Sequence, residues 1–193
     1  MAQLRIDKIF SENLGETLGS AIREQVLSLF NRQVPSSLGI WLNPLPFFGS
    51  EKKRHFKALW AACLQGMAIN AAVNTILDTD YDEKMIRKTS FTLQQFTDDS
   101  IAKGVLSHLN ADELKHYNDV RRQFLRLAME RNTSLSNFVN ALYIGFVGEN
   151  AKVLTPTQSA KALKEFELAY NLFVKLVHIT LESPNSYKRN YGA

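Results

Sequence analysis

The spacing of Glu113 and His116 is the first pattern in this chain that could do chemistry. The run Glu113-Leu114-Lys115-His116 has the Glu-x-x-His spacing of a di-iron carboxylate helix, which places both ligands on one helix face. Such a site also needs a second copy of the motif and two further carboxylates. The chain has no second copy. We therefore interpret the pair as part of a solvated helix face, and we predict no metal and no cofactor.

An acidic segment, Asp78 to Glu83, has the spacing that opens a calcium loop. Asp78, Asp80 and Asp82 stand at alternate positions, where the side chains of such a loop converge on the ion. However, Glu83 replaces the glycine that makes the sharp turn, and Thr89 replaces the bidentate glutamate at the end of the loop. The sequence therefore predicts a solvated acidic turn that interacts favourably with the start of the following helix.

The usual arrangements for nucleophilic catalysis are missing from the sequence. There is no Gly-x-Ser-x-Gly turn and no glycine-rich phosphate loop. The single Cys63 lies in an apolar run without a base nearby in sequence, which is typical of an inert buried thiol. The four histidines fall on different predicted helices, so a cluster in space stays open; they are His55, His108, His116 and His178. These observations predict a protein that is not an enzyme.

Polar side chains interrupt the most apolar helical run of the chain. Asn70, Asn74 and Asp78 follow one another at steps of four residues, and Gln65 precedes them. Residues at that spacing share one helix face. They fit a pocket between helices that takes a small ligand, with a histidine alongside. They fit equally well a set of buried amides that hydrogen-bond neighbouring helices.

A helix-turn-helix that contacts nucleic acid is one interpretation of residues 98–131. Its second helix would carry three cations on one face: Lys115, Arg122 and Arg126. Acidic residues lie at the start of that helix and among the cations, at Asp112, Glu113 and Asp119. A salt-bridged exposed face is therefore favoured over one that reads DNA. Sequence-independent phosphate contact through the three cations is kept as the alternative function.

The segment 34–50 is the strongest departure from an ordinary helical protein. It holds three prolines and two glycines, which break helical periodicity. Loops of this length without their own secondary structure are uncommon in compact domains and are often functional. Large apolar side chains occupy positions where polar turn residues are the norm, namely Trp41, Leu42, Leu45, Phe47 and Phe48.

Cations follow this loop at the start of the next predicted helix, as Lys52, Lys53, Arg54 and Lys57. Positive charge there opposes the helix dipole, at a cost of roughly 0.3–1 kcal/mol per group. A bound anion would relieve this cost, and so would the acidic segment 78–83 of the same chain. Three interpretations stay open: a structural cap, an aromatic docking site with a basic rim, or contact with nucleic acid or an anionic membrane.

Helices must position all of these residues, because apolar side chains recur at steps of three and four almost throughout. The predicted helices span about 4–33, with a break near Ser11, then 50–77, 84–96, 98–109, 110–131, 134–147 and 155–182. Ser50, Asn110 and Thr155 are predicted N-caps, and the Gly-x-x-Gly run that ends at Gly148 is predicted to be a helix end. The fold class is thus all-α, a single-domain bundle of about six to eight helices over residues 1–183, with a flexible tail at 184–193.

Composition places the chain in an ordinary globular class. It has 193 residues, 45% of them hydrophobic, and a net charge of +4, which falls short of the dense basic surface of a dedicated nucleic-acid binder. The uncharged stretch 58–77 contains several amides, so we interpret it as a core helix and not a membrane span. One cysteine, and charges where the apolar part of a signal peptide would lie, predict a cytoplasmic protein.

Together these patterns predict a non-enzymatic helical interaction protein, such as an adaptor, a regulator or an accessory subunit of a larger assembly. Its partner-binding residues are expected to be Trp41, Phe47, Phe48, Lys52, Lys53, Arg54 and Lys57. A protein partner is favoured, nucleic acid is the alternative, and a membrane surface is the least favoured.

Overall fold

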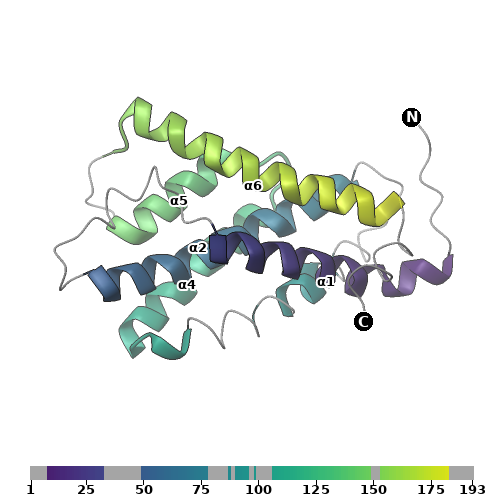
Figure 1. Ribbon diagram of the computed structural model, residues 1–193, viewed down its shortest axis with the longest axis horizontal. Helices are drawn as coiled ribbons and strands as arrows, with labels where there is room; N and C mark the ends of the chain where they lie inside the picture. Colours follow the sequence, from purple (N-terminus) through teal and green to yellow (C-terminus); the bar gives the residue numbers. More distant parts are fainter. Residues whose placement is uncertain are drawn as a thin grey trace.

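The computed structural model describes residues 8–32, 49–77, 87, 90–95, 98, 106–148 and 153–182, with the side chains of 8–16, 30–32, 49–53 and 77 outside that description. Over this part of the chain the named α-helices are α1 (Lys8–Arg32), α2 (Gly49–Leu77), α4 (Ala111–Met129), α5 (Leu135–Val147) and α6 (Pro156–Glu182). Residues 90–95, within the predicted helix 84–96, are helical as well, as are residues 87 and 98. A 3-10 turn, η2 (Leu106–His108), precedes α4. The predicted all-α bundle is confirmed (Figure 1).

Helix α2 is the centre of the bundle. It contacts α1, α4, α5 and α6, and every residue from Ala58 to Val73 is buried. Figure 1 shows α6 on one side of α2 and α4 on the other. The segment Arg54–Ile76 is long and apolar enough to cross a membrane by length and composition alone, and 94% of its most apolar window is buried inside the fold. The structure therefore places it as the predicted core helix.

Helices α2 and α4 run in the same direction. The ring of His55 stacks on that of His116 near their first turns, and Asn70 bonds to the carbonyl of Ala128 near their ends. Helix α5 runs the opposite way, because His116 contacts its Gly145. The start of α4 and the end of α5 therefore both lie against the first turns of α2.

Two glycines let these helices approach closely. A Cβ atom built on Gly66 of α2 would lie 3.0 Å from the Cβ of Phe124 and 3.1 Å from its carbonyl oxygen. On Gly145 of α5 it would lie 2.9 Å from a methyl group of Val120. Contacts this short exceed the tolerance of a well-packed interior. The packing of α4 on α2 and on α5 therefore requires glycine at positions 66 and 145.

Hydrogen bonds at the helix starts confirm two predicted capping boxes. The amide of Glu113 donates to the Asn110 side chain, and the amide of Asn110 donates to the Glu113 carboxylate, both at 2.9 Å. The amide of Gln158 donates to the Thr155 hydroxyl at 3.3 Å, and the Thr155 amide donates to the Gln158 side chain at 3.1 Å. Each pair satisfies donors that have no partner inside the helix. The predicted end at Gly148 is also found, with a positive φ of 93°.

Some predicted boundaries are wrong. Ser50 lies inside α2 instead of capping it, because the amides of the first turn need no intrahelical partner and several neighbouring starts are similar in energy. Helix α1 continues through Ser11 without the predicted break. The described residues at the end of the predicted helix 98–109 form the tighter η2 turn.

Asn70 and Asn74 hold three helices together. The Asn70 amide group donates to the carbonyls of Leu127, Ala128 and Glu130, at 3.1–3.4 Å, where α4 ends. Its side-chain oxygen accepts from Asn74 at 3.1 Å and from the Tyr170 hydroxyl of α6 at 3.0 Å. Of the two interpretations left open for these amides, the structure shows the bonding between helices. Asp78, at the end of the same ladder, lies outside the described residues.

Candidate functional site

The start of α2 carries the described part of the predicted docking site. Arg54 and Lys57 are both exposed, while Phe56 between them is buried in the core. Lys52 and Lys53 belong to α2, but their side chains lie outside the described part. The predicted anchors Trp41, Phe47 and Phe48, and the acidic segment 78–83, lie outside it as well. The geometry of the site is therefore built on residues 54–57 and their neighbours.

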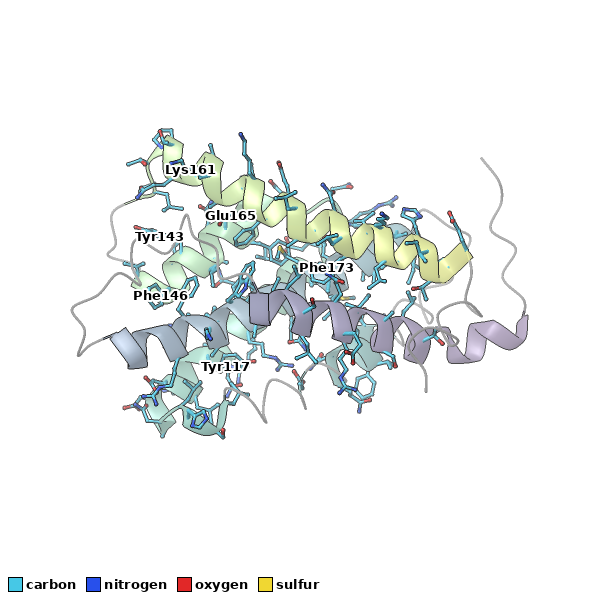
Figure 2. The ribbon with its side chains drawn as sticks, viewed as in Figure 1. Tyr117, Tyr143, Phe146, Lys161, Glu165 and Phe173 are labelled. Atoms are coloured by element: carbon cyan, nitrogen blue, oxygen red, sulfur yellow. The ribbon has the colours of Figure 1, made fainter. Side chains whose placement is uncertain are left out.

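Two histidines from different helices meet at this end of the bundle. The rings of His55 (α2) and His116 (α4) stack with centroids 5.3 Å apart and an angle of 26° between their planes. The ring of Phe146 (α5) lies 6.4 Å from that of His55 and meets Phe56 edge-on at 4.9 Å. Figure 2 labels Phe146 beside the start of α2. Of the four histidines whose clustering the sequence left open, the structure brings this pair together.

A backbone contact orients the His116 ring. Its Nε2 lies 2.5 Å from the carbonyl oxygen of Gly145. Since a carbonyl only accepts hydrogen bonds, Nε2 must carry the proton, and Nδ1 is the acceptor in the neutral ring. The residue that the sequence suggested as a metal ligand is thus held by α5. Within the described ranges, no three His, Cys, Asp or Glu side chains gather so that they could hold a metal ion.

The charge state of His55 depends on its burial and on two neighbours. Burial lowers its pKa, repulsion from His116 when that ring is protonated lowers it further, and the carboxylate of Glu113 partly opposes both effects. The His55 Nδ1 is buried and has no hydrogen-bond partner. The arrangement therefore favours a neutral His55.

We expect the stability of the chain to fall below pH 6.5 because of His55. Its pKa is depressed from 6.5 in the folded state, so the unfolded chain takes up the proton first as the pH drops. The contribution of His55 to the free energy of unfolding is fully present above pH 6.5 and is lost as the pH falls through the folded pKa. Urea unfolding of wild type and His55→Phe at pH 7.5, 6 and 5 checks this, and the variant should lose less stability on acidification.

A matched control for this experiment is His178→Phe. It removes an exposed histidine from α6, away from the ring stack. This variant should keep the acid sensitivity of the wild type. If His55→Phe and His178→Phe respond to pH in the same way, His55 is not the group responsible.

The cations of the alternative, nucleic-acid set lie along the exposed face of α4. Lys115, Arg122 and Arg126 are all exposed. Lys115 directly precedes His116, so it shares the end of the bundle that carries Arg54 and Lys57. Arg122 and Arg126 lie about 10 and 16 Å farther along the helix axis than Lys115, at 1.5 Å per residue. We name Arg54, Lys57 and Lys115 the cationic end.

Acidic side chains interrupt the α4 face. Arg122 pairs with Asp119 at 3.3 Å, one turn earlier in the helix. Asp112 and Glu113 occupy the first turn of α4, where the helix dipole favours negative charge. The face therefore alternates in sign, as a salt-bridged solvent face does.

A partly buried polar cluster that sequence reasoning missed joins α2 to α4. Arg121 donates to both carboxylate oxygens of Asp98 at 2.7 Å and to the side-chain oxygen of Gln65 at 3.3 Å. Gln65 in turn donates to Asp98 at 3.0 Å. Nearby, burial raises the pKa of Tyr117 to about 12, with Arg121 opposing the shift and Asp98 adding to it. The mutual hydrogen bonds fasten Asp98 to α2 and α4.

The single cysteine is a core residue of α2. Cys63 is fully buried in α2, and burial raises the pKa of its thiol well above the ordinary value. A thiol that stays protonated is a poor nucleophile. The structure thus agrees with the interpretation of Cys63 as a core residue.

Comparisons of this chain with protein-family models, curated proteins and solved structures found no match.

Proposed function

We propose that this chain is a non-enzymatic helical interaction protein, an accessory subunit or regulator, that docks onto a partner protein through its cationic end. The supporting observation is the ring stack of His55 and His116, which joins α2 and α4 at that end. Exposed Arg54 and Lys57 flank His55 in the sequence, and exposed Lys115 adjoins His116. Positive charge thus gathers around a partly buried aromatic cluster, which is the composition of many interfaces.

The sign pattern of α4 favours a protein partner over nucleic acid. A phosphate-binding face collects cations without nearby carboxylates. On α4, Asp119 already pairs with Arg122, and two acids stand in the first turn. A partner protein with acidic groups opposite Arg54 and Lys57 fits this mixed surface better.

The bonding of the buried amides also supports an interaction protein over a small-ligand enzyme. Asn70 and Gln65 were the residues that suggested a pocket between helices. Asn70 bonds to backbone carbonyls at the end of α4, and Gln65 bonds to Asp98 and Arg121. Their hydrogen-bonding groups are thus used to join helices.

Affinity purification of charge-reversed variants tests the proposal. We expect Arg54→Glu/Lys57→Glu to lose a protein partner that the wild type captures from a lysate of the source cells, by about tenfold or more, because like charges then face each other. The control Arg126→Glu/Arg131→Glu makes the same change of charge on two exposed residues, one in the last turn of α4 and one just after it, and should keep the partner. Nuclease treatment should leave the capture unchanged.

Two outcomes would contradict the proposal. Capture that is equal for both double variants and wild type would exclude the cationic end as the docking surface. Captured nucleic acid that disappears with nuclease, with an affinity that falls linearly with salt on logarithmic axes, would support the alternative function.

The triple variant Trp41→Ala/Phe47→Ala/Phe48→Ala tests whether the predicted aromatic anchors belong to the same docking surface. We expect this variant to lose the same partner.

A further inference from the structure

Helix α6 presents a row of apolar side chains on its outer face. Leu168, Leu172 and Ile179 are 64%, 43% and 44% exposed. Its inner face is buried separately, through Ala162, Phe166, Ala169, Phe173 and Val177. Figure 1 shows α6 along the edge of the bundle, and Figure 2 shows Phe173 on the side of α6 that faces the other helices. The exposed row is therefore additional to the residues that hold α6 in the fold.

The exposed row has the spacing of a coiled-coil seam. Seven residues follow one another at alternating steps of four and three: Lys161, Glu165, Leu168, Leu172, Lys175, Ile179 and Glu182. This alternation is the heptad pattern by which one helix packs along another. We call these seven residues the α6 seam. Its two leucines stand at the centre, with opposite charges on either side.

The order of the charges specifies how a second helix would pack. In a parallel pair of identical helices, Glu165 would face Glu165 and Lys175 would face Lys175, and like charges repel. In the antiparallel register that places Leu168 opposite Leu172, Glu165 instead lies opposite Lys175. The two-fold axis repeats both contacts, so this register gives two leucine contacts and two Glu–Lys pairs. It also places Lys161 opposite Ile179, where the aliphatic stem of the lysine packs on the isoleucine. A shift by one heptad would place Glu165 opposite Glu182 and Leu172 opposite Lys175.

The same register uses the whole length of the helix. It centres on residue 170, next to residue 169 at the middle of Pro156–Glu182. Two helices of 27 residues then overlap over about 40 Å, at 1.5 Å per residue. Tyr170 is bonded to Asn70 and Asn74 on α2. The hydrogen bonds of Tyr170 and the buried inner residues fix the rotation of α6 about its axis, so the seam faces away from the bundle.

From this match of apolar and charged positions, we propose that the α6 seam is a self-association surface on which a second copy of the chain packs antiparallel. The inference goes beyond the proposed function and does not rest on it, because the cationic end lies on α2 and α4. Glu165 has an interaction within its own chain, and a carboxylate accepts several hydrogen bonds, so it can take a second cation from the other copy.

Sedimentation of the purified full-length chain over a series of concentrations tests the proposal. We expect reversible dimer formation by the wild type. Glu165→Lys alone places Lys opposite Lys, and Lys175→Glu alone places Glu opposite Glu, so each should weaken the dimer by about tenfold or more. The double variant Glu165→Lys/Lys175→Glu restores two opposite-charge pairs and should recover the dimer.

Mixing the two single variants gives the sharpest readout. One copy then presents two lysines and the other presents two glutamates at these positions, so the mixture should form a heterodimer although neither variant dimerises well alone. The control Glu167→Lys makes the same change of charge at an exposed position of α6 outside the seam, and should dimerise as the wild type does. Circular dichroism checks that each variant remains folded.

Three outcomes would overturn the proposal. The wild type could remain a monomer throughout the series. The single variants could associate as strongly as the double variant, which would separate dimerisation from the Glu–Lys pairs. The mixture could show no more association than its components, which would exclude the antiparallel register. Because the experiment contains no other protein, its result is independent of whether the cationic end binds a partner.

Discussion

Replacing Asn70 with leucine is expected to destabilise the chain by about 3 kcal/mol or more. Asn70 is completely buried, and its amide group donates to carbonyls at the end of α4 while its oxygen accepts from Asn74 and Tyr170. Leucine has the same branching and the same number of side-chain heavy atoms but no polar ones, so these partners lose their hydrogen bonds inside the protein. Each buried group left without a partner costs roughly 1–3 kcal/mol. Urea unfolding followed by circular dichroism measures the loss.

A surface control and a double-mutant cycle make the Asn70 prediction specific. Asn140→Leu introduces the same change at an exposed position of α5, and should alter stability by no more than about 0.5 kcal/mol. Tyr170→Phe should cost about 1 kcal/mol in the wild type and less in the Asn70→Leu background, because the Tyr170 hydroxyl donates to Asn70. Additive effects of the two changes would show that the bond contributes nothing measurable.

Gly66→Val is expected to cost about 3 kcal/mol, enough to leave a marginally stable chain largely unfolded. Even the first carbon of the new side chain would lie 3.0 Å from the Cβ of Phe124 and 3.1 Å from a ring carbon of Phe138. The carbonyl oxygen of Phe124, also at 3.1 Å, belongs to the backbone of α4 and can move only with the helix. Thermal unfolding and the yield of soluble protein measure the effect, and a stable, soluble Gly66→Val would contradict it.

Gly145 offers a contrast, because the atoms that oppose it belong to a side chain. Its added Cβ would meet two methyl carbons of Val120 at 2.9 and 3.0 Å, and the β-branched side chain of valine cannot easily rotate away. Gly145→Ala should therefore cost about 1–2 kcal/mol. Val120→Ala removes both methyl groups, so the double variant should lose less stability than the sum of the single ones. No such rescue is available at Gly66.

Local features of the sequence predicted the helices well. The Asn110 and Thr155 caps bond as expected, because a capping box involves residues only three positions apart. The apolar period correctly predicted α2 as the core helix. Ser50 was assigned wrongly, since a small polar residue in the first turn of a helix is tolerated either as a cap or inside it.

The candidate site was predictable only in part. The charges of Arg54 and Lys57 and their place at a helix start are visible in the sequence. Their proximity to His116 is not, since His55 and His116 are 61 positions apart in the sequence and meet because α2 and α4 run in parallel. The cluster of Gln65, Asp98 and Arg121 was missed for the same reason. Gln65 in an apolar run was its one visible signal, because a buried amide needs a partner.

The amino-acid sequence by itself determined which segments are helical, where the most apolar helix lies, and the alternating charges and leucines along 161–182. Each of these follows from interactions within a few turns of one helix. The tertiary structure decided which faces became interior. It turned Phe173 inward and left Leu168 exposed, although both are large apolar residues of the same helix. It also brought the two histidines together, because contacts between residues far apart in the sequence form only when their helices pack. How closely α4 packs on α2 and α5 depends on Gly66 and Gly145, whose role appears only in the packed structure.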